Sequence, residues 1–248
     1  MGIKDLFSVF SADARKEKAF DKMRSKLVSR NHQHDDRMWC IQQLAEMDSV
    51  EGTRALFRRW DMVADKKRED ITEKEYLADV LAEKGPTILP QLQEHNDRSV
   101  NVTRPIQVLQ RVVEAEEVVT ELLRVLKNEN ERLASFRPEK KLRLIQLLSD
   151  YGDDPRLTAG VVPCIADFDA DVRFEAAVLL GKAGTEQCRD ALLDRLCSPE
   201  EESERVRQAI LTALADRGFE VLSAKEQITP LLGDQWRIGP RGSLIAAD

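Results

Sequence analysis

The sequence has few turn-forming residues, with 11 glycines and 9 prolines among 248 residues. This is about 8% of the chain, where roughly 12% is average. The shortage excludes a collagen-like chain and a low-complexity coil, and a hydrophobic content of 42% is too high for wholesale disorder. Leu, Ala, Glu, Lys and Arg are abundant instead, and they are the residues that favour helices. We therefore expect an all-α fold.

Cysteine pairs and long apolar runs are also missing. The four cysteines are scattered and form no CxxC motif: Cys40, Cys164, Cys188 and Cys197. No apolar stretch approaches the ~20 residues that cross a bilayer. The short apolar start contains Lys4 and Asp5, which is unlike a secretory signal. We interpret the cysteines as buried apolar residues in a reducing compartment, and we expect a soluble, cytoplasmic protein.

The charge is unevenly distributed. The net charge is −7 and the pI is near 5.3, which argues against a nucleic-acid partner because phosphate binding needs a cationic field. Residues 1–34 nevertheless carry more cations than acids, and 12–30 form a predicted basic amphipathic helix. With the apolar residues that precede it, residues 2–30 could contact an anionic membrane. We favour the alternative that this segment caps the first repeat.

One pattern recurs along the chain at a mean spacing of about 34 residues. A cation is followed by apolar residues at +3, +4 and +7, which share one side of a helix, and by a glycine-type break at +11. The cations are Arg37, Lys74, Lys141, Arg173 and Arg207, and a weaker copy spans 102–113. The breaks are Asp48, Gly85, Val113, Gly152, Gly184 and Gly218. At these breaks the pattern predicts a left-handed residue that ends the helix.

A second helical pattern precedes most copies, so each unit is a predicted helix pair. These first helices are expected at 50–60, 88–95, 118–127, 157–166 and 186–197. A lone pair cannot bury both faces, so neighbouring pairs must stack. The sequence predicts one domain over 1–248, an α-solenoid of about six pairs at 35–218. A C-terminal cap at 219–248 ends in a small β-hairpin of 235–238 and 243–245.

The stretch from Val161 to Gly184, and above all Asp171-Val172-Arg173-Phe174-Glu175-Ala176-Ala177, resembles a HEAT repeat of the phycobilisome-lyase-like type common in bacteria. The resemblance is closest over 155–220 and extends to 35–90. It implies a right-handed solenoid whose second helices line a concave surface. It also implies a role as a protein-binding scaffold.

The candidate partner-binding residues lie off the apolar side of the second helices, at positions +2, +5 and +9 after each cation. They are Trp39, Tyr76, Glu83, Arg104, Gln107, Arg143, Gln146 and Asp150. Trp, Tyr and Arg are enriched among the anchors of protein interfaces. Acids at the +9 positions favour a basic partner segment. The alternative is that Trp39 and Tyr76 fill gaps between helices.

The recurring cations have a structural interpretation, because a cation near a helix start opposes the helix dipole and needs an acid nearby.

Residues 60–71 are expected to form the longest loop within a repeat, and His95 is expected to be in solvent. His32 and His34 complete no metal site. HExxH, phosphate-loop and GxSxG motifs are missing from the sequence.

We therefore expect a non-enzymatic scaffold that binds a protein segment and carries no cofactor or metal. Two alternatives stay open. One is a HEAT-like enzyme acting on DNA or on a chromophore-bearing protein, as a glycosylase or a lyase would. The other is a peripheral membrane adaptor that uses residues 2–30.

Overall fold

The computed structural model describes residues 3–132 and 137–247, with residues 3–13 described by their backbone only. The chain divides into two compact units, 1–118 and 119–248. Each unit is built mainly from pairs of helices. A continuous solenoid in a single domain stays a prediction.

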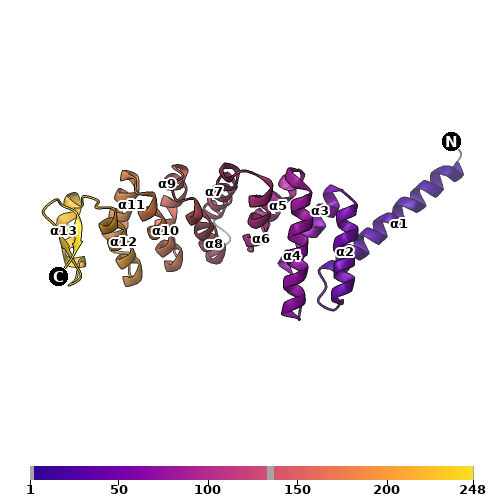
Figure 1. Ribbon diagram of the computed structural model, residues 1–248, viewed down its shortest axis with the longest axis horizontal. Helices are drawn as coiled ribbons and strands as arrows, with labels where there is room; N and C mark the ends of the chain where they lie inside the picture. Colours follow the sequence, from indigo (N-terminus) through magenta and orange to yellow (C-terminus); the bar gives the residue numbers. More distant parts are fainter. Residues whose placement is uncertain (1–2, 133–136, 248) are drawn as a thin grey trace. The chain divides into compact units, whose positions relative to one another are not determined.

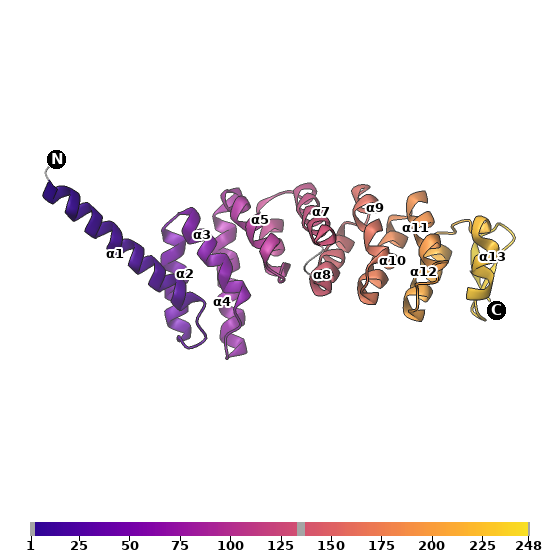
Figure 2. The same cartoon turned by 180° about the vertical axis from the view of Figure 1, so that it is seen from behind.

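The first unit begins with the long helix α1 (Ile3–Leu27), which starts earlier and ends three residues sooner than the basic helix predicted at 12–30. It continues with α2 (His34–Glu46), α3 (Val50–Phe57), a 3-10 turn η1 (Arg58–Asp61), and α4 (Lys67–Glu83). A second turn η2 (Gly85–Ile88) leads into α5 (Leu89–Arg98), and α6 (Thr103–Val112) follows. The second helices α2, α4 and α6 pack in sequence, and α3 packs on α5. Figures 1 and 2 both show α2 and α4 side by side.

The second unit takes in most of α7 (Ala115–Glu131) and then α8 (Pro138–Leu148) with a 3-10 turn η3 (Ser149–Tyr151). The next pair is α9 (Arg156–Val161) with η4 (Val162–Ala166), followed by α10 (Ala170–Ala183). The last pair is α11 (Glu186–Leu196) and α12 (Glu204–Asp216). The second helices α8, α10 and α12 again pack in sequence.

The repeated apolar positions form the core of each unit, as the pattern predicts. Every residue at +3, +4 and +7 after the five cations is buried, with at most 7% of its surface exposed. In α2 these residues are Cys40, Ile41 and Leu44, and in α10 they are Ala176, Ala177 and Leu180. Burial of aliphatic side chains at this spacing is what holds each helix against its neighbours.

The predicted breaks are confirmed at four of six positions. Asp48, Gly85, Gly184 and Gly218 all have left-handed backbones, with φ between 44° and 66°. The prediction is wrong at Gly152, where φ is −52° because the chain continues through η3 instead of reversing. It is also wrong at Val113, which ends α6 in an extended conformation with φ −139°.

The expected loop at 60–71 is also shorter than predicted. The helix α4 begins at Lys67, and Arg59 and Trp60 are buried in the first unit.

Pro105 does not interrupt α6, because it is the third residue of the helix, where the missing N–H would have no partner within the helix.

The C-terminal segment forms the predicted cap. After η5 (Leu222–Ala224), α13 (Lys225–Ile228) and η6 (Thr229–Leu231), strands β1 (Trp236–Ile238) and β2 (Leu244–Ala246) pair antiparallel. The hairpin packs on α12, where the Trp236 indole donates to the Gln208 side chain at 3.2 Å. The last pair of helices is thus covered, and the predicted hairpin is confirmed.

In the part of the chain that the structure describes, none of the helices could cross a membrane. The backbone of α1 is helical as predicted. The side chains at 3–13 and the residues 1–2 lie outside the description, so a membrane contact through 2–30 stays a prediction, as does a cytoplasmic location.

Candidate functional site

The candidate site is the second-helix face, by which we mean the exposed sides of α2, α4 and α6 in the first unit and of α8, α10 and α12 in the second. All eight predicted residues lie outside the core. The side chains of Glu83, Gln107 and Asp150 are exposed, and Trp39 is 50% exposed although it is a large aromatic residue. The other four, Tyr76, Arg104, Arg143 and Gln146, are partly exposed.

In the first unit this face is hollowed by a groove between α2 and α4. Its volume is about 570 Å³, and it brings together Tyr76 and Glu83 of the predicted set. The other lining residues are Gln42, Ala45, Glu46, Val80 and Lys84. Trp39 lies one helical turn before Gln42 on α2. We call this the α2–α4 groove.

The acids of the α2–α4 groove are available to a partner. Among residues 14–132 and 137–247, whose side chains the structure describes, none forms an ion pair with Glu83 or with Glu46. The Glu46 carboxylate accepts from the Gln43 amide at 3.1 Å. The one cation in the lining, Lys84, is already held by the Ala45 carbonyl at 2.8 Å and by Asp48 at 3.1 Å. The groove therefore presents negative charge beside an aromatic ring.

The remaining candidates are partly engaged within their own units. Arg104 lies 3.8 Å from Glu75, and Gln107 is exposed on α6 without joining the α2–α4 groove. In the second unit, Arg143 contacts Gln146 at 3.4 Å, and the Gln146 amide reaches Glu175 at 3.4 Å. Asp150 is exposed, and none of the residues described in its unit forms an ion pair with it. The predicted residues therefore form separate patches.

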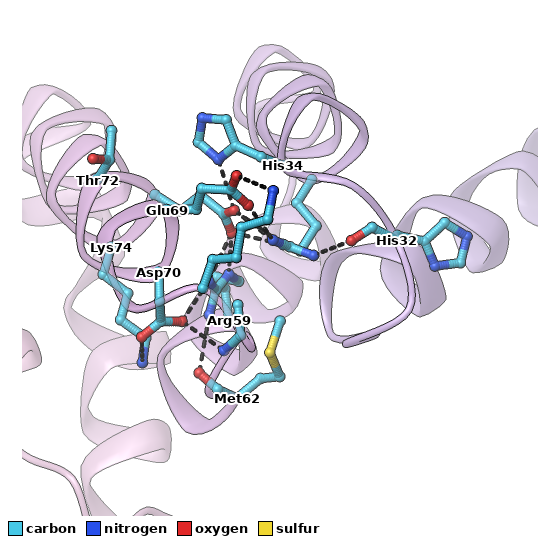
Figure 3. A network of polar contacts seen from close by, with 12 residues as sticks. His32, His34, Arg59, Met62, Glu69, Asp70, Thr72 and Lys74 are labelled. Carbon is cyan, nitrogen blue, oxygen red and sulfur yellow. Dashed lines mark hydrogen bonds and ion pairs between the residues drawn. The ribbon is translucent and has the colours of Figure 1, made fainter.

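Two of the recurring cations, Arg37 and Arg173, lie in buried charge clusters instead of on a binding surface. In the first cluster, Glu73 accepts from Arg37 at 2.8 to 3.1 Å and from Arg59 at 2.8 Å. Arg59 also donates to Asp70 at 2.7 Å and to the Met62 carbonyl at 2.9 Å, as Figure 3 shows. The cluster joins α2, η1 and α4.

The second unit contains a matching cluster. Glu201 accepts from Arg173 of α10 at 2.8 and 2.9 Å and from Arg195 of α11 at 2.7 Å. Arg37 and Arg59 are 22 residues apart, and so are Arg173 and Arg195. We call these two groups the Arg–Glu–Arg clusters, centred on Glu73 and on Glu201.

Both central carboxylates are ionised at neutral pH. Burial alone would raise the pKa of Glu201, but hydrogen bonds from Arg173, Arg195 and a backbone N–H lower it to about 2. The same balance of burial against guanidinium hydrogen bonds lowers the pKa of Glu73. Charge-assisted hydrogen bonds of this kind favour the ionised acid. The predicted structural role agrees with this geometry for Arg37 and Arg173.

The sequence reasoning missed most members of these clusters. Arg59, Arg195 and Glu201 look like ordinary surface charges in the sequence. Glu73, which precedes the recurring cation Lys74, is the seventh residue of α4. The shared spacing of 22 residues between arginines was the available signal. His95 is a further correction: it is 7% exposed, and its ring lies 5.4 Å from Phe57 and 6.1 Å from Trp60.

The chemistry that these groups can perform is limited. His34 shares a 2.8 Å hydrogen bond with Glu73, an arrangement that orients imidazoles in catalytic and metal sites. Among the residues that the structure describes, however, His, Cys, Asp and Glu form no group of three that could hold a metal ion. Burial raises the pKa of the Cys164 thiol to about 11 and also raises that of Cys40, which makes both poor nucleophiles.

Comparison with known proteins found no matching family model and no matching curated protein. Among solved structures, human deoxyhypusine hydroxylase in complex with glycerol is 14% identical, with 90% of this chain and 92% of that chain covered and a TM-score of 0.32. A crystal structure of an engineered protein is 19% identical, with 86% and 84% covered and a TM-score of 0.23. At these values neither likeness assigns an activity.

The first of these structures nevertheless corrects one expectation. That structure is of an enzyme, which contradicts the expectation of a non-enzymatic protein. The expectation is withdrawn, and no activity is assigned to this chain. The likeness to a phycobilisome-lyase-like family and a bacterial origin stay predictions.

Proposed function

We propose that the chain binds a partner polypeptide through the second-helix face of its first unit, and that the bound segment is basic. The observation that supports this proposal is the α2–α4 groove, where Glu46 and Glu83 flank Tyr76 without an ion pair from any described residue. Trp39, half exposed on the same helix as Glu46, adds a second aromatic contact.

A lysine or arginine side chain fits these contacts better than an acidic or purely apolar one. Its aliphatic stem would lie on the Tyr76 ring, and its charge would reach the carboxylates at the groove edge. Exposed Trp and Tyr side chains supply contact area at a small cost in conformational entropy. The same acidic lining opposes the approach of a nucleic-acid phosphate.

Selection from a phage-displayed library of random peptides tests the proposal. The wild-type protein is expected to enrich peptides rich in Lys and Arg, because the groove lining offers unpaired carboxylates. The double variant Glu46→Gln/Glu83→Gln and the variant Tyr76→Ala are expected to lose this enrichment. Glu51→Gln is the matched control, because Glu51 is an exposed acid on α3, outside the second-helix face.

Two results would contradict the proposal. One is selection without any enrichment of basic peptides. The other is enrichment that all four proteins show equally, since the binding surface would then lie elsewhere.

A further inference from the structure

The second unit has a groove of a different character between α10 and α12. Its volume is about 550 Å³. Phe174 and Val178 of α10 line one side, and Ala209 and Ala213 of α12 line the other. We call it the α10–α12 groove.

Small residues bring the two helices close together at the floor of this groove. A Cβ atom added to Gly181 would lie 2.6 Å from the Cβ of Ala213, closer than real side-chain atoms approach. The missing side chain lets α10 and α12 pack at this point. One and two turns toward the start of α10, Val178 and Phe174 stand beside the small residues of α12 and leave a hollow with apolar walls.

The charged residues around the α10–α12 groove are mainly cations. Three line it, Lys182, Arg205 and Arg217, against one acid, Asp216. The Arg205 guanidinium lies 3.9 Å from the centre of the Phe174 ring and also pairs with Asp171, which holds it at the edge of the groove. Arg217 donates to the Gly181 carbonyl at 2.6 Å. None of the residues described in the second unit forms an ion pair with Lys182, which is exposed.

We infer that the α10–α12 groove binds an acidic polypeptide segment that carries an apolar side chain. The apolar residue would enter between Val178 and Ala209, where burial of its surface is favourable. A flanking carboxylate would pair with Lys182, which forms no ion pair with the residues described in its unit. A second could reach the Arg205 guanidinium, which Asp171 holds at the edge of the groove. This inference goes beyond the proposed function, because it concerns another surface and a partner of the opposite charge.

Two fluorescein-labelled peptides of about eight residues test the inference by fluorescence anisotropy. One alternates glutamate with leucine, and the other has lysine in place of glutamate. The acidic peptide is expected to bind the full chain in a way that depends on Lys182. Any binding of the basic peptide is expected to occur at the α2–α4 groove and to be unchanged by Lys182→Glu. Because the contacts are charged and exposed, the affinity for the acidic peptide is expected to fall as salt is added.

Three variants locate the site. Lys182→Glu is expected to weaken binding of the acidic peptide about tenfold or more, which corresponds to the loss of one charged contact. Ala209→Trp fills the hollow and is expected to abolish binding. Lys225→Glu is the matched control, because it reverses an exposed lysine outside the groove. The ellipticity at about 222 nm, measured by circular dichroism, checks that each variant keeps its helices.

The outcomes separate this inference from the proposed function. Glu46→Gln/Glu83→Gln is expected to leave the acidic peptide's affinity unchanged, since both residues lie in the α2–α4 groove. The inference is overturned if the acidic peptide fails to bind the wild-type protein. It is also overturned if Lys182→Glu and Ala209→Trp bind the peptide as tightly as Lys225→Glu does.

Discussion

Replacing Glu201 by glutamine tests the Arg–Glu–Arg cluster of the second unit most directly. The Glu201 side chain is fully buried and is the shared acceptor of Arg173 and Arg195. Glutamine keeps the shape but removes the charge, so two buried guanidiniums would face each other without a carboxylate. Removing one partner of a buried ion pair costs about 3 to 5 kcal/mol.

The lowered pKa of Glu201, which has the same contacts as its cause, corresponds to a free energy of similar size. The pKa falls from 4.5 to about 2 on folding, which corresponds to about 3 kcal/mol of stabilisation at neutral pH. The total free energy of unfolding of a domain is about 5 to 15 kcal/mol. Glu201→Gln is therefore expected to remove a large part of the stability of the second unit.

The same reasoning predicts a pH dependence. Because folding lowers the pKa of Glu201, its stabilisation is complete above about pH 4.5 and is lost as the pH falls toward 2. The wild-type protein is therefore expected to lose stability in this window. The difference between wild type and Glu201→Gln is expected to shrink there.

Urea unfolding followed by circular dichroism at pH 7 and at pH 3 measures both effects, at about 25 °C. Glu202→Gln is the control, because Glu202 is the exposed neighbour of Glu201 and its replacement is expected to change stability by less than about 0.5 kcal/mol. If Glu201→Gln unfolds at pH 7 at the same urea concentration as Glu202→Gln, the cluster does not stabilise the fold and our reasoning is refuted.

Two further predictions concern a turn and a thiol. Gly218→Ala is expected to cost about 1 kcal/mol of stability, because φ is 62° there, although a Cβ would have open space. Gly152→Ala, at φ −52°, is expected to be neutral or slightly stabilising. Equal thermal stabilities of the two variants would contradict this prediction. Cys164, whose pKa is about 11, is expected to resist iodoacetamide at pH 8 until the protein unfolds, while the partly exposed Cys197 reacts first. Mass spectrometry of the labelled peptides measures the order, and equal labelling of both thiols in the native protein would show that Cys164 is accessible.

The sequence predicts the helix pairs well because each depends on a local pattern. Apolar residues at +3, +4 and +7 place one side of a helix in the core, and an acid before α10 caps it, as Asp169 does by accepting from the N–H groups of Asp171 and Val172. The backbone conformation at Gly152 was predicted wrongly because a glycine permits a left-handed turn without requiring one. The start of α4 was predicted too late because its first turn, rich in Lys, Arg and Glu, looks like a solvated loop although these residues favour helices.

The buried charges could not be predicted in the same way. Whether Glu201 lies in solvent or between two arginines depends on how the loop after α11 packs against α10. A repeating pattern of nearby residues contains no information about that packing. The candidate surface was predicted only in part for the same reason. Tyr76 and Glu83, at +2 and +9 after Lys74, do line a groove. The groove exists, however, because α2 packs beside this part of α4, which the sequence pattern does not show.

The order of the residues in the two Arg–Glu–Arg clusters has a consequence for synthesis. In both, the acid follows its two arginines along the chain: Glu73 after Arg59, and Glu201 after Arg195. A nascent chain that has emerged as far as Arg195 already carries both guanidiniums and still lacks their carboxylate. In these two clusters the contact between arginines of successive helices is therefore completed by a segment made after them. A truncation between Arg195 and Glu201 would leave the arginines of α10 and α11 without the carboxylate that joins them.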